Sequence, residues 1–406
     1  MPFWLLIAYI FLVLTHLFSG ITYHVGSVLR ILPYVILCLF LMIVGNAIGQ
    51  KFTIKNSIPK IHITIKISTF IAIIGAMMLT YDIIRLNDIV LGLRIQDHQI
   101  SIIGVIGNIF ASLGIIVWLY SLHNFIIHNT KLPLFAYLSF LSYVTGGILS
   151  AGRQAFILII LSTIIMILWS IKRKHELGLK NKIRFSKKEL FGFIVLCSLF
   201  IGYFLFISST RSRIAKLEDK VLALEYEFNA TVSDETTSVM YNMGPLSDIY
   251  IEVLFYYSHE LIKLDLIYQD YNYPPTMGFS QLSYVARRFQ WLLGDAIDKT
   301  WDQIVHVTED KNNFYSHTWG TFIINFIVDF GRIGTLIACL ISGIIFGITY
   351  RSLRKQPTTE KIIRQCLMLA GIIFSIQFSP FAELIWTFPL LLIFFIKIKD
   401  TPKYVS

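Results

Sequence analysis

The sequence has few charged residues and few cysteines. Charged residues make up only 15% of the 406 positions, whereas hydrophobic residues make up 55%, and the mean hydropathy is +0.66. A soluble chain of this length would be expected to form two or three domains, and this composition excludes that arrangement. All four cysteines lie within apolar runs, so the sequence predicts neither a disulfide framework nor a CxxC metal site; they are Cys38, Cys197, Cys339 and Cys366.

Several motifs of enzyme chemistry are also missing. The chain has no Walker A loop, no GxGxxG run and no HExxH. The first predicted external loop, ITYHVGSVLR, contains no acidic residue. Metal-dependent glycosyltransferases of the oligosaccharyltransferase kind place an acidic motif in that loop. We therefore expect no metal, no cofactor and no nucleotide-sugar mechanism.

Apolar runs recur from end to end, each near the roughly 20 residues that cross a bilayer. Each must be helical, because lipid offers no partner for a free backbone N–H or C=O group. The first run has no basic residues before it, so we expect a retained span rather than a cleaved signal peptide. The fold class predicted is an all-α polytopic membrane protein of about ten transmembrane helices, at residues 3–18, 29–49, 67–84, 101–120, 133–150, 154–171, 190–208, 333–350, 366–382 and 384–398.

The formal charge of +10 reflects topology rather than a nucleic-acid partner. Lys and Arg concentrate in short connections between apolar runs, as expected of cytoplasmic loops. These connections fall on one side of the membrane when the number of spans is even. Both termini are then cytoplasmic, and the basic stretches are 50–66, 171–189, 351–365 and the tail after 397.

The opposite side carries one large segment, residues 209–318, with 16 acidic and nine basic residues. It separates N-terminal spans in 1–208 from C-terminal spans in 319–406. Helices are predicted at 211–228 and 249–268. The second has its polar residues on one face, which suits a helix lying in the membrane interface; these are Glu252, His259, Glu260 and Lys263.

Arginines on the predicted external side are candidate phosphate ligands. The preference for internal cations makes them less expected there, and a guanidinium binds phosphate oxygens in bidentate fashion. We expect them to hold a pyrophosphate group, although an Arg at a helix end can instead snorkel or pair with an acid. They are Arg153 (SAGRQAF), Arg211 and Arg213 (SSTRSR), Arg287 and Arg288 (YVARRFQW) and Arg332 (DFGRIG).

Two further residues are candidates for catalysis. His317, in FYSHTWGTF, lies just before the last group of spans and is suited to take a proton from a sugar hydroxyl. Its alternative role is structural. Asp329 lies in an apolar helical run, where a carboxylate is costly unless it is functional or paired. The simplest pairing is with Arg332 at i+3.

The runs SAGRQAF, SSTRSR and HTWGTFIINFIVDFGRIG resemble those of the O-antigen, or oligosaccharide repeat-unit, polymerases of the Wzy type. The predicted topology is similar over nearly the whole length. The resemblance implies a GT-C-like membrane glycosyltransferase in the bacterial inner membrane, with its large loop in the periplasm. Such an enzyme transfers a glycan from undecaprenyl pyrophosphate to a second lipid-linked repeat unit, without metal or nucleotide.

The resemblance also implies roles for individual residues and partners. Arg153, Arg211 and Arg213 would hold the pyrophosphate and stabilise the leaving group. His317 would be the base or would orient the acceptor, and Asp329 matches the Asp of the family's DFG stretch. The aromatic loop would cover the sugars. The partners implied are the lipid-linked oligosaccharide, membrane lipid and a chain-length regulator protein.

Two alternatives stay open from the residues alone. O-antigen ligases share this architecture, and only the resemblance separates them from polymerases. A flippase that transports the same lipid-linked unit is the alternative from another class of protein. It would be expected to have more spans, short loops on both faces and charges in the middle of its spans. One dominant external loop and arginines on a single face favour the enzyme.

Overall fold

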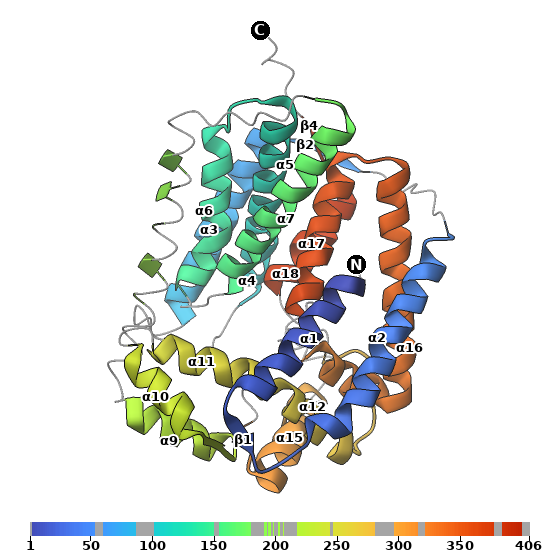
Figure 1. The fold of residues 1–406 in the computed structure, drawn as a ribbon. Helices are drawn as coiled ribbons and strands as arrows, with labels where there is room; N and C mark the ends of the chain where they lie inside the picture. The colour runs from blue at the N-terminus through green and yellow to red at the C-terminus, as the bar shows by residue number, and fades with distance from the viewer. Residues whose placement is uncertain are drawn as a thin grey trace. The chain divides into compact units, whose positions relative to one another are not determined.

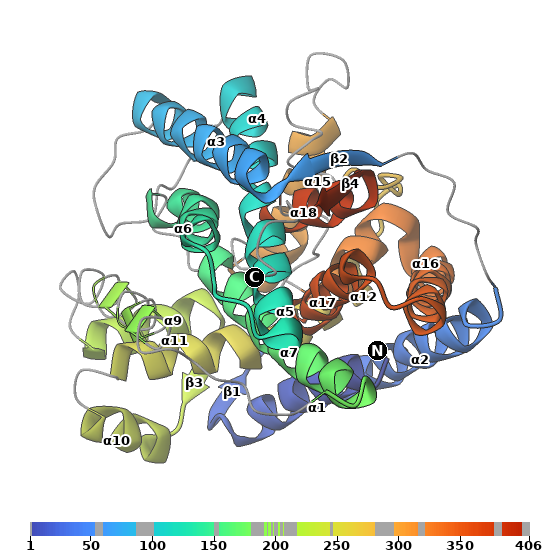
Figure 2. The same ribbon diagram turned by 90° about the horizontal axis from the view of Figure 1, so that it is seen from above.

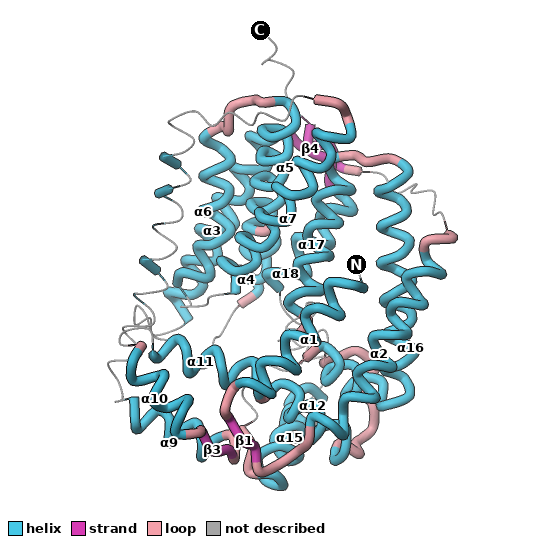
Figure 3. The backbone as a smooth tube through the Cα atoms, viewed as in Figure 1, coloured by secondary structure: helices cyan, strands magenta, loops and turns pink. Residues whose placement is uncertain are grey.

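The computed structural model describes residues 2–52, 60–86, 101–149, 154–179, 217–243, 247–280, 296–315, 321–376 and 384–399, together with several residues between 191 and 206. Nearly all the described elements are helices (Figure 3). The chain divides into two compact units, each built from segments that are distant in sequence. Unit 1 comprises Met1–Thr53, Ser212–Arg351 and Gly371–Glu383, and unit 2 comprises Ile54–Arg211, Ser352–Ala370 and Leu384–Ser406.

The described residues contain five helices that are long and apolar enough to cross a membrane. They are Val28–Gly49, Ile65–Leu86, Ile102–His128, Ala155–Glu176 and Phe322–Lys355. Three shorter apolar helices accompany them, at Trp4–Phe18, Leu134–Thr145 and Trp386–Phe395. The chain is thus a helical membrane protein, as its composition indicates, and the total of ten spans stays a prediction.

Three predicted spans have a different internal structure. The run at 101–120 forms two helices, α4 (Ile102–Ala111) and α5 (Leu113–His128). The span at 333–350 is the later part of a longer helix, α16 (Phe322–Lys355), whose backbone is non-helical at Gly331. The last span ends early, because α18 (Leu384–Phe395) continues as strand β4 (Ile396–Lys399). The span at 190–208 lies mostly outside the described residues.

Unit 1 combines the first two helices with the long segment after residue 211 (Figure 1). Strand β1 (Ile21–Tyr23) pairs antiparallel with β3 (Ala230–Val232). This pairing joins the connection between α1 and α2 to the long segment. The helices of the unit are α1 (Pro2–Phe18), α2 (Val28–Gly49), α9 (Leu217–Glu227), α10 (Asp234–Asn242), α11 (Ser247–Ser258), α12 (Glu260–Asp270), α15 (Ala296–Val305), the π-helix η2 (His306–Asp310), most of α16 and the end of α17 (Thr359–Phe374).

Helices α2 and α16 lie side by side in Figures 1 and 2 and meet through glycines. Gly45 and Gly49 form a GxxxG pair on α2, and Gly343 and Gly347 form another on α16. A Cβ atom on any of the four would overlap backbone atoms of the facing helix. Small residues at this spacing let two membrane helices approach closely, so this contact depends on the absence of side chains.

Unit 2 is a helical bundle seen from above in Figure 2. It contains α3 (Ile65–Leu86), α4, α5, α6 (Leu134–Leu149), α7 (Gln154–Glu176), α18 and the first part of α17. Strand β2 (Ile61–Thr64) pairs parallel with β4, with His62 opposite Lys397. The pairing joins the stretch 50–66 to the end of the last predicted span.

Within the described part of the segment 209–318, the helices differ from those predicted. The helix predicted at 249–268 is two helices, α11 and α12, which meet at His259. Residues 260–267 of α12 are buried all round, including Glu260, Lys263 and Asp265. The prediction of a helix lying in the membrane interface was therefore wrong for α12, because its polar residues are buried with the apolar ones. The helix predicted at 211–228 is described only as α9, from Leu217.

Candidate functional site

The predicted site residues divide into two described ones and six others. Asp329 and Arg332 lie in the described part of α16. The other six lie outside the described residues, so their roles stay predictions from the sequence. They are Arg153, Arg211, Arg213, Arg287, Arg288 and His317.

Asp329 is fully buried and holds a turn of the long segment. Its Oδ1 atom accepts hydrogen bonds from the Thr276 hydroxyl at 2.5 Å and from the backbone N–H of Ser280 at 2.8 Å. Its own carbonyl accepts from the N–H of Met277 at 2.9 Å. Met277 and Gly278 have φ angles of 53° and 101°, as a tight turn requires. Asp329 thus docks the Pro/Gly-containing turn YNYPPTMGFS against α16.

Arg332 binds the C-terminal end of α12. Its Nε atom donates to the carbonyl of Tyr268 at 2.6 Å, and Nη2 donates to the carbonyl of Gln269 at 3.0 Å. The guanidinium also lies 5.2 Å from the centre of the Tyr268 ring. A cation at a helix C-terminus satisfies free carbonyls and complements the helix dipole. Arg332 therefore supports the end of α12. Its remaining guanidinium nitrogen, Nη1, makes no hydrogen bond among the described residues.

The ion pair expected between Asp329 and Arg332 does not form. At Gly331 the backbone has φ 69° and ψ 177°, which interrupts the helix between the two residues. The i, i+3 geometry on which the pairing depends is lost at such a break. Each side chain instead binds a different part of the long segment.

Asp265 joins the middle of α12 to the start of α2. Its carboxylate is fully buried and accepts from the N–H of Ser27 at 2.8 Å and from Arg30 Nε at 3.1 Å. The Ser27 N–H belongs to the N-terminus of α2, where a negative charge is favoured. Gly26 has φ 70°, and a Cβ atom there would lie 2.9 Å from Ile262 Cγ2. The loop therefore needs glycine to bring Ser27 and Arg30 to the carboxylate.

Glu260, at the start of α12, is buried without a hydrogen bond. Neither carboxylate oxygen has a partner, and the same is true of the buried hydroxyls of Tyr9 and Thr321. Burial raises the pKa of Glu260 well above its usual value, although the charge of Lys263 opposes the shift. Burial therefore favours the neutral form of this carboxyl group. A protonated acid next to hydroxyl groups can hold a proton or pass it on.

Lys263 lies one turn beyond Glu260 and is also buried. Burial lowers its pKa to about 8, with Glu260 and Glu309 opposing the shift. The sequence pattern predicted Glu260 and Lys263 on the polar face of a helix. It did not predict that they would form a buried pair. The available signal was their i, i+3 spacing in the apolar and aromatic stretch SHELIKLDLIY.

Aromatic residues of the long segment pack mainly on one another. The His259 ring lies 4.8 Å from that of Phe228 and 6.1 Å from that of Phe314, and these two Phe rings are 5.4 Å apart. This cluster is part of the core of unit 1. Tyr226 and Tyr241 are exposed, at 76% and 51%. Among the described aromatic residues of the segment, such outer rings are the ones placed to contact sugars without a rearrangement.

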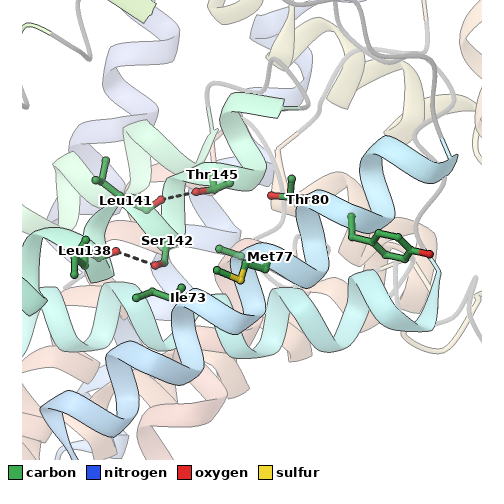
Figure 4. A pocket seen from close by; sticks show the side chains of 9 residues that line it. Ile73, Met77, Thr80, Leu138, Leu141, Ser142 and Thr145 are labelled. Carbon is green, nitrogen blue, oxygen red and sulfur yellow. Dashed lines mark hydrogen bonds between the residues drawn. The ribbon is translucent and has the colours of Figure 1, made fainter.

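Unit 2 has an apolar groove between α3 and α6, with a volume of about 450 Å³. Ser142 and Thr145 donate to the carbonyls of Leu138 and Leu141 of their own helix, each at 2.8 Å (Figure 4). None of the described lining residues is charged, and none is a predicted site residue. The groove is thus unsuited to a pyrophosphate group. Its lining is Ile73, Ala76, Met77, Thr80, Tyr81, Leu138, Leu141, Ser142 and Thr145.

No protein-family model matches the chain, and neither the curated proteins nor the solved structures contain a match. Within the described residues, no group of three or more His, Cys, Asp or Glu side chains is placed to hold a metal ion. Fold and composition define the chain as a helical membrane protein. Its long segment belongs to unit 1 and contributes buried charged side chains to it.

Proposed function

We propose that this protein is a GT-C-like membrane glycosyltransferase of about ten spans that polymerises oligosaccharide repeat units carried on undecaprenyl pyrophosphate. The reaction takes place at the periplasmic face of the bacterial inner membrane. The observation that carries the proposal is the set of three runs SAGRQAF, SSTRSR and HTWGTFIINFIVDFGRIG, which resemble the Wzy-type polymerases.

The packing of the long segment supports this proposal. A segment that only linked two spans would not need to bury charges. Here α12 is enclosed by its neighbours, and Asp265 and Arg332 tie it to α2 and α16. Rigid support of this kind is what a site needs if it is to hold two glycan chains in reacting positions.

In the proposed reaction Arg153, Arg211 and Arg213 bind the pyrophosphate of the donor. Their fixed donors stabilise the negative charge that develops on the leaving group. His317 accepts the proton of the attacking sugar hydroxyl or orients it. Asp329 has a positioning role in this proposal: its Oδ1 atom accepts hydrogen bonds from Thr276 and Ser280 and so holds the turn.

The decisive experiment is a gel of surface polysaccharide from a strain that lacks the gene. Under the proposal, lipopolysaccharide carries a single repeat unit and no ladder, and the chain restores the ladder when it is supplied again. Complete loss of the repeat unit indicates a ligase or a flippase. An unchanged ladder contradicts the assignment to glycan assembly.

A point variant then tests the mechanism. Arg153→Ala should abolish the ladder while the protein still reaches the membrane, because the pyrophosphate loses a bidentate ligand. Lys51→Ala is the matched control, since Lys51 is an exposed cation in a predicted cytoplasmic loop. A full ladder from Arg153→Ala would remove Arg153 from the site.

A further inference from the structure

A second group of cations in unit 2 lies outside the proposed reaction. It is centred on Arg364, near the start of α17, and extends to the paired strands β2 and β4. Lys60 belongs to the stretch 50–66, and Lys361 and Arg364 belong to 351–365, both predicted to be cytoplasmic. Lys397 lies at the end of the last predicted span, next to the tail. The cation cluster consists of Lys60, Lys361, Arg364 and Lys397.

Arg364 is the unusual member of the cation cluster. It is only 5% exposed, and its Nε atom is buried without a hydrogen-bond partner. Its guanidinium lies 4.8 Å from the centre of the Phe394 ring. Among the described residues, no carboxylate forms an ion pair with it. A guanidinium cannot escape burial by losing its proton, so a buried and unpaired one is costly.

Lys60 and Lys361 lie close enough to this guanidinium to be repelled by it, and Lys60 is also repelled by Lys397. Burial lowers the pKa of Lys60, and the nearby charge of Glu360 opposes this shift. Repulsion from Arg364 and Lys397 lowers the pKa further. Burial likewise lowers the pKa of Lys361, with added repulsion from Arg364 and Lys60. Four cations thus lie together with Glu360 as the neighbouring acid, and Glu360 makes no ion pair with them among the described residues.

The backbone adds to the positive potential. Helix α17 begins at Thr359, so Arg364 follows the first turn, where the free N–H groups and the helix dipole favour an anion. His62 and Lys397 are register partners in the β2–β4 ribbon and so project from the same face of it. Lys397 is exposed, whereas Arg364 is buried. The cation cluster therefore runs from solvent into the interior.

We propose that the cation cluster binds a phosphate group, carried either by an anionic lipid headgroup or by a free phosphate compound. A phosphate offers several oxygens to the planar fork of Arg364 and to the three ammonium groups. Basic pockets between membrane helices on the cytoplasmic side are suited to lipid phosphates. This site is independent of the polymerase reaction, because none of its residues belongs to the proposed glycan site.

Thermal melting of the purified full-length protein tests this site. The probes are phosphatidylglycerol, phosphatidylcholine and inorganic phosphate, each added in detergent. Phosphatidylglycerol should raise the melting temperature more than phosphatidylcholine does, and Arg364→Gln should lose this difference. Lys397→Gln should weaken the apparent affinity about fivefold, as expected for one surface cation. Lys51→Gln, a change at an exposed lysine, is the control and should behave as wild type.

The source of the phosphate follows from the same data. Stabilisation by phosphatidylglycerol alone identifies a lipid headgroup, and stabilisation by inorganic phosphate in lipid-free detergent identifies a soluble compound. Equal responses to the two lipids with no response to phosphate would overturn the site. If Arg364→Gln does not fold, the double variant Lys60→Gln/Lys397→Gln replaces it, and an unchanged response in that variant would also overturn the site.

Discussion

Two buried charges, one in each unit, are compensated differently: Asp265 of unit 1 and Arg364 of unit 2. In unit 1 the carboxylate of Asp265 has an arginine and a backbone N–H, and Arg332 has helix carbonyls. In unit 2 Arg364 has an aromatic ring and no acceptor among the described residues. A buried charge with partners is part of the architecture, whereas one without them indicates a ligand.

Glu260 shows that residue type matters as well as location. It is as deeply buried as Arg364 and likewise has no hydrogen bond. A carboxyl group becomes neutral by binding a proton, and burial raises the pKa of Glu260 accordingly. A guanidinium has no such route. The same burial therefore produces a proton-holding acid in unit 1 and a candidate anion site in unit 2.

The largest effect is expected at the contact that holds unit 1 together. Gly347→Leu places a side chain against the backbone of Asn46, which cannot move aside, and the expected loss exceeds about 3 kcal/mol. Gly202→Leu is the control, because a Cβ atom there meets nothing within 4 Å. Size-exclusion chromatography after heating measures both. Equal survival of the two variants would show that α2 and α16 do not depend on their glycines.

Removal of a compensated charge should cost somewhat less. Asp265→Ala leaves Arg30 and the Ser27 N–H without their acceptor, and the expected loss of stability is about 2 kcal/mol. This loss is smaller than that for a fully buried pair, because Arg30 is half exposed. Asp310→Ala removes an exposed partner of His306 and should cost less than about 0.5 kcal/mol. Melting temperatures compare the two, and a larger effect at Asp310 would contradict the contrast between buried and exposed pairs.

Asp329 separates positioning from catalysis. Asp329→Asn keeps an acceptor oxygen for Thr276 and Ser280 and should retain most polymer formation, whereas Asp329→Ala should lose it together with about 2 kcal/mol of stability. The length of the polysaccharide ladder and the melting temperature are the two readouts. An inactive but fully stable Asn variant would make Asp329 a proton-transfer residue instead.

A substitution in unit 2 should have the opposite sign. Arg364→Met replaces an unpaired buried cation with an apolar side chain of similar length, so stability without anionic lipid should rise by about 1 kcal/mol. Melting in phosphatidylcholine and detergent alone provides the measurement. Destabilisation there would mean that Arg364 has a structural partner after all, and its contrast with Asp265 would disappear.

The smallest effect is expected for Glu260→Gln below neutral pH, because an amide resembles a protonated carboxyl group in shape. The expected change in stability is less than about 0.5 kcal/mol. The folded chain holds the Glu260 proton at a higher pKa than the unfolded chain does. Wild-type stability should therefore fall as the pH rises from about 4.3 to the raised pKa, and Glu260→Gln should lack this slope. Melting temperatures from pH 5 to pH 8 test this, and parallel profiles would show that Glu260 is ionised throughout.

Much of the fold was predictable from apolar runs alone. The predicted spans 29–49 and 67–84 lie within α2 and α3, because lipid leaves an apolar run no alternative to a helix. Interruptions within helices were not predictable from composition. One break lies at Gly331, and another at His259, where α11 and α12 meet. Both depend on the residues that pack against them, which local sequence does not show.

The candidate site was less predictable than the fold. The residue types at Asp329 and Arg332 marked them as costly in an apolar helix, and both do make specific contacts. Their partners lie about 50 to 65 positions away in sequence, in the long segment. No local spacing points to such partners, which is why the nearest charge, at i+3, was the wrong choice.

The amino-acid sequence alone determined that this chain is a helical membrane protein, since the desolvation cost of a free peptide group in lipid depends on composition and not on packing. Only the tertiary structure decided which charges are compensated. Whether Asp265 has a partner and Arg364 has none depends on how segments distant in sequence come together. Electrostatic compensation acts over a few ångströms in space, and sequence distance does not report that separation.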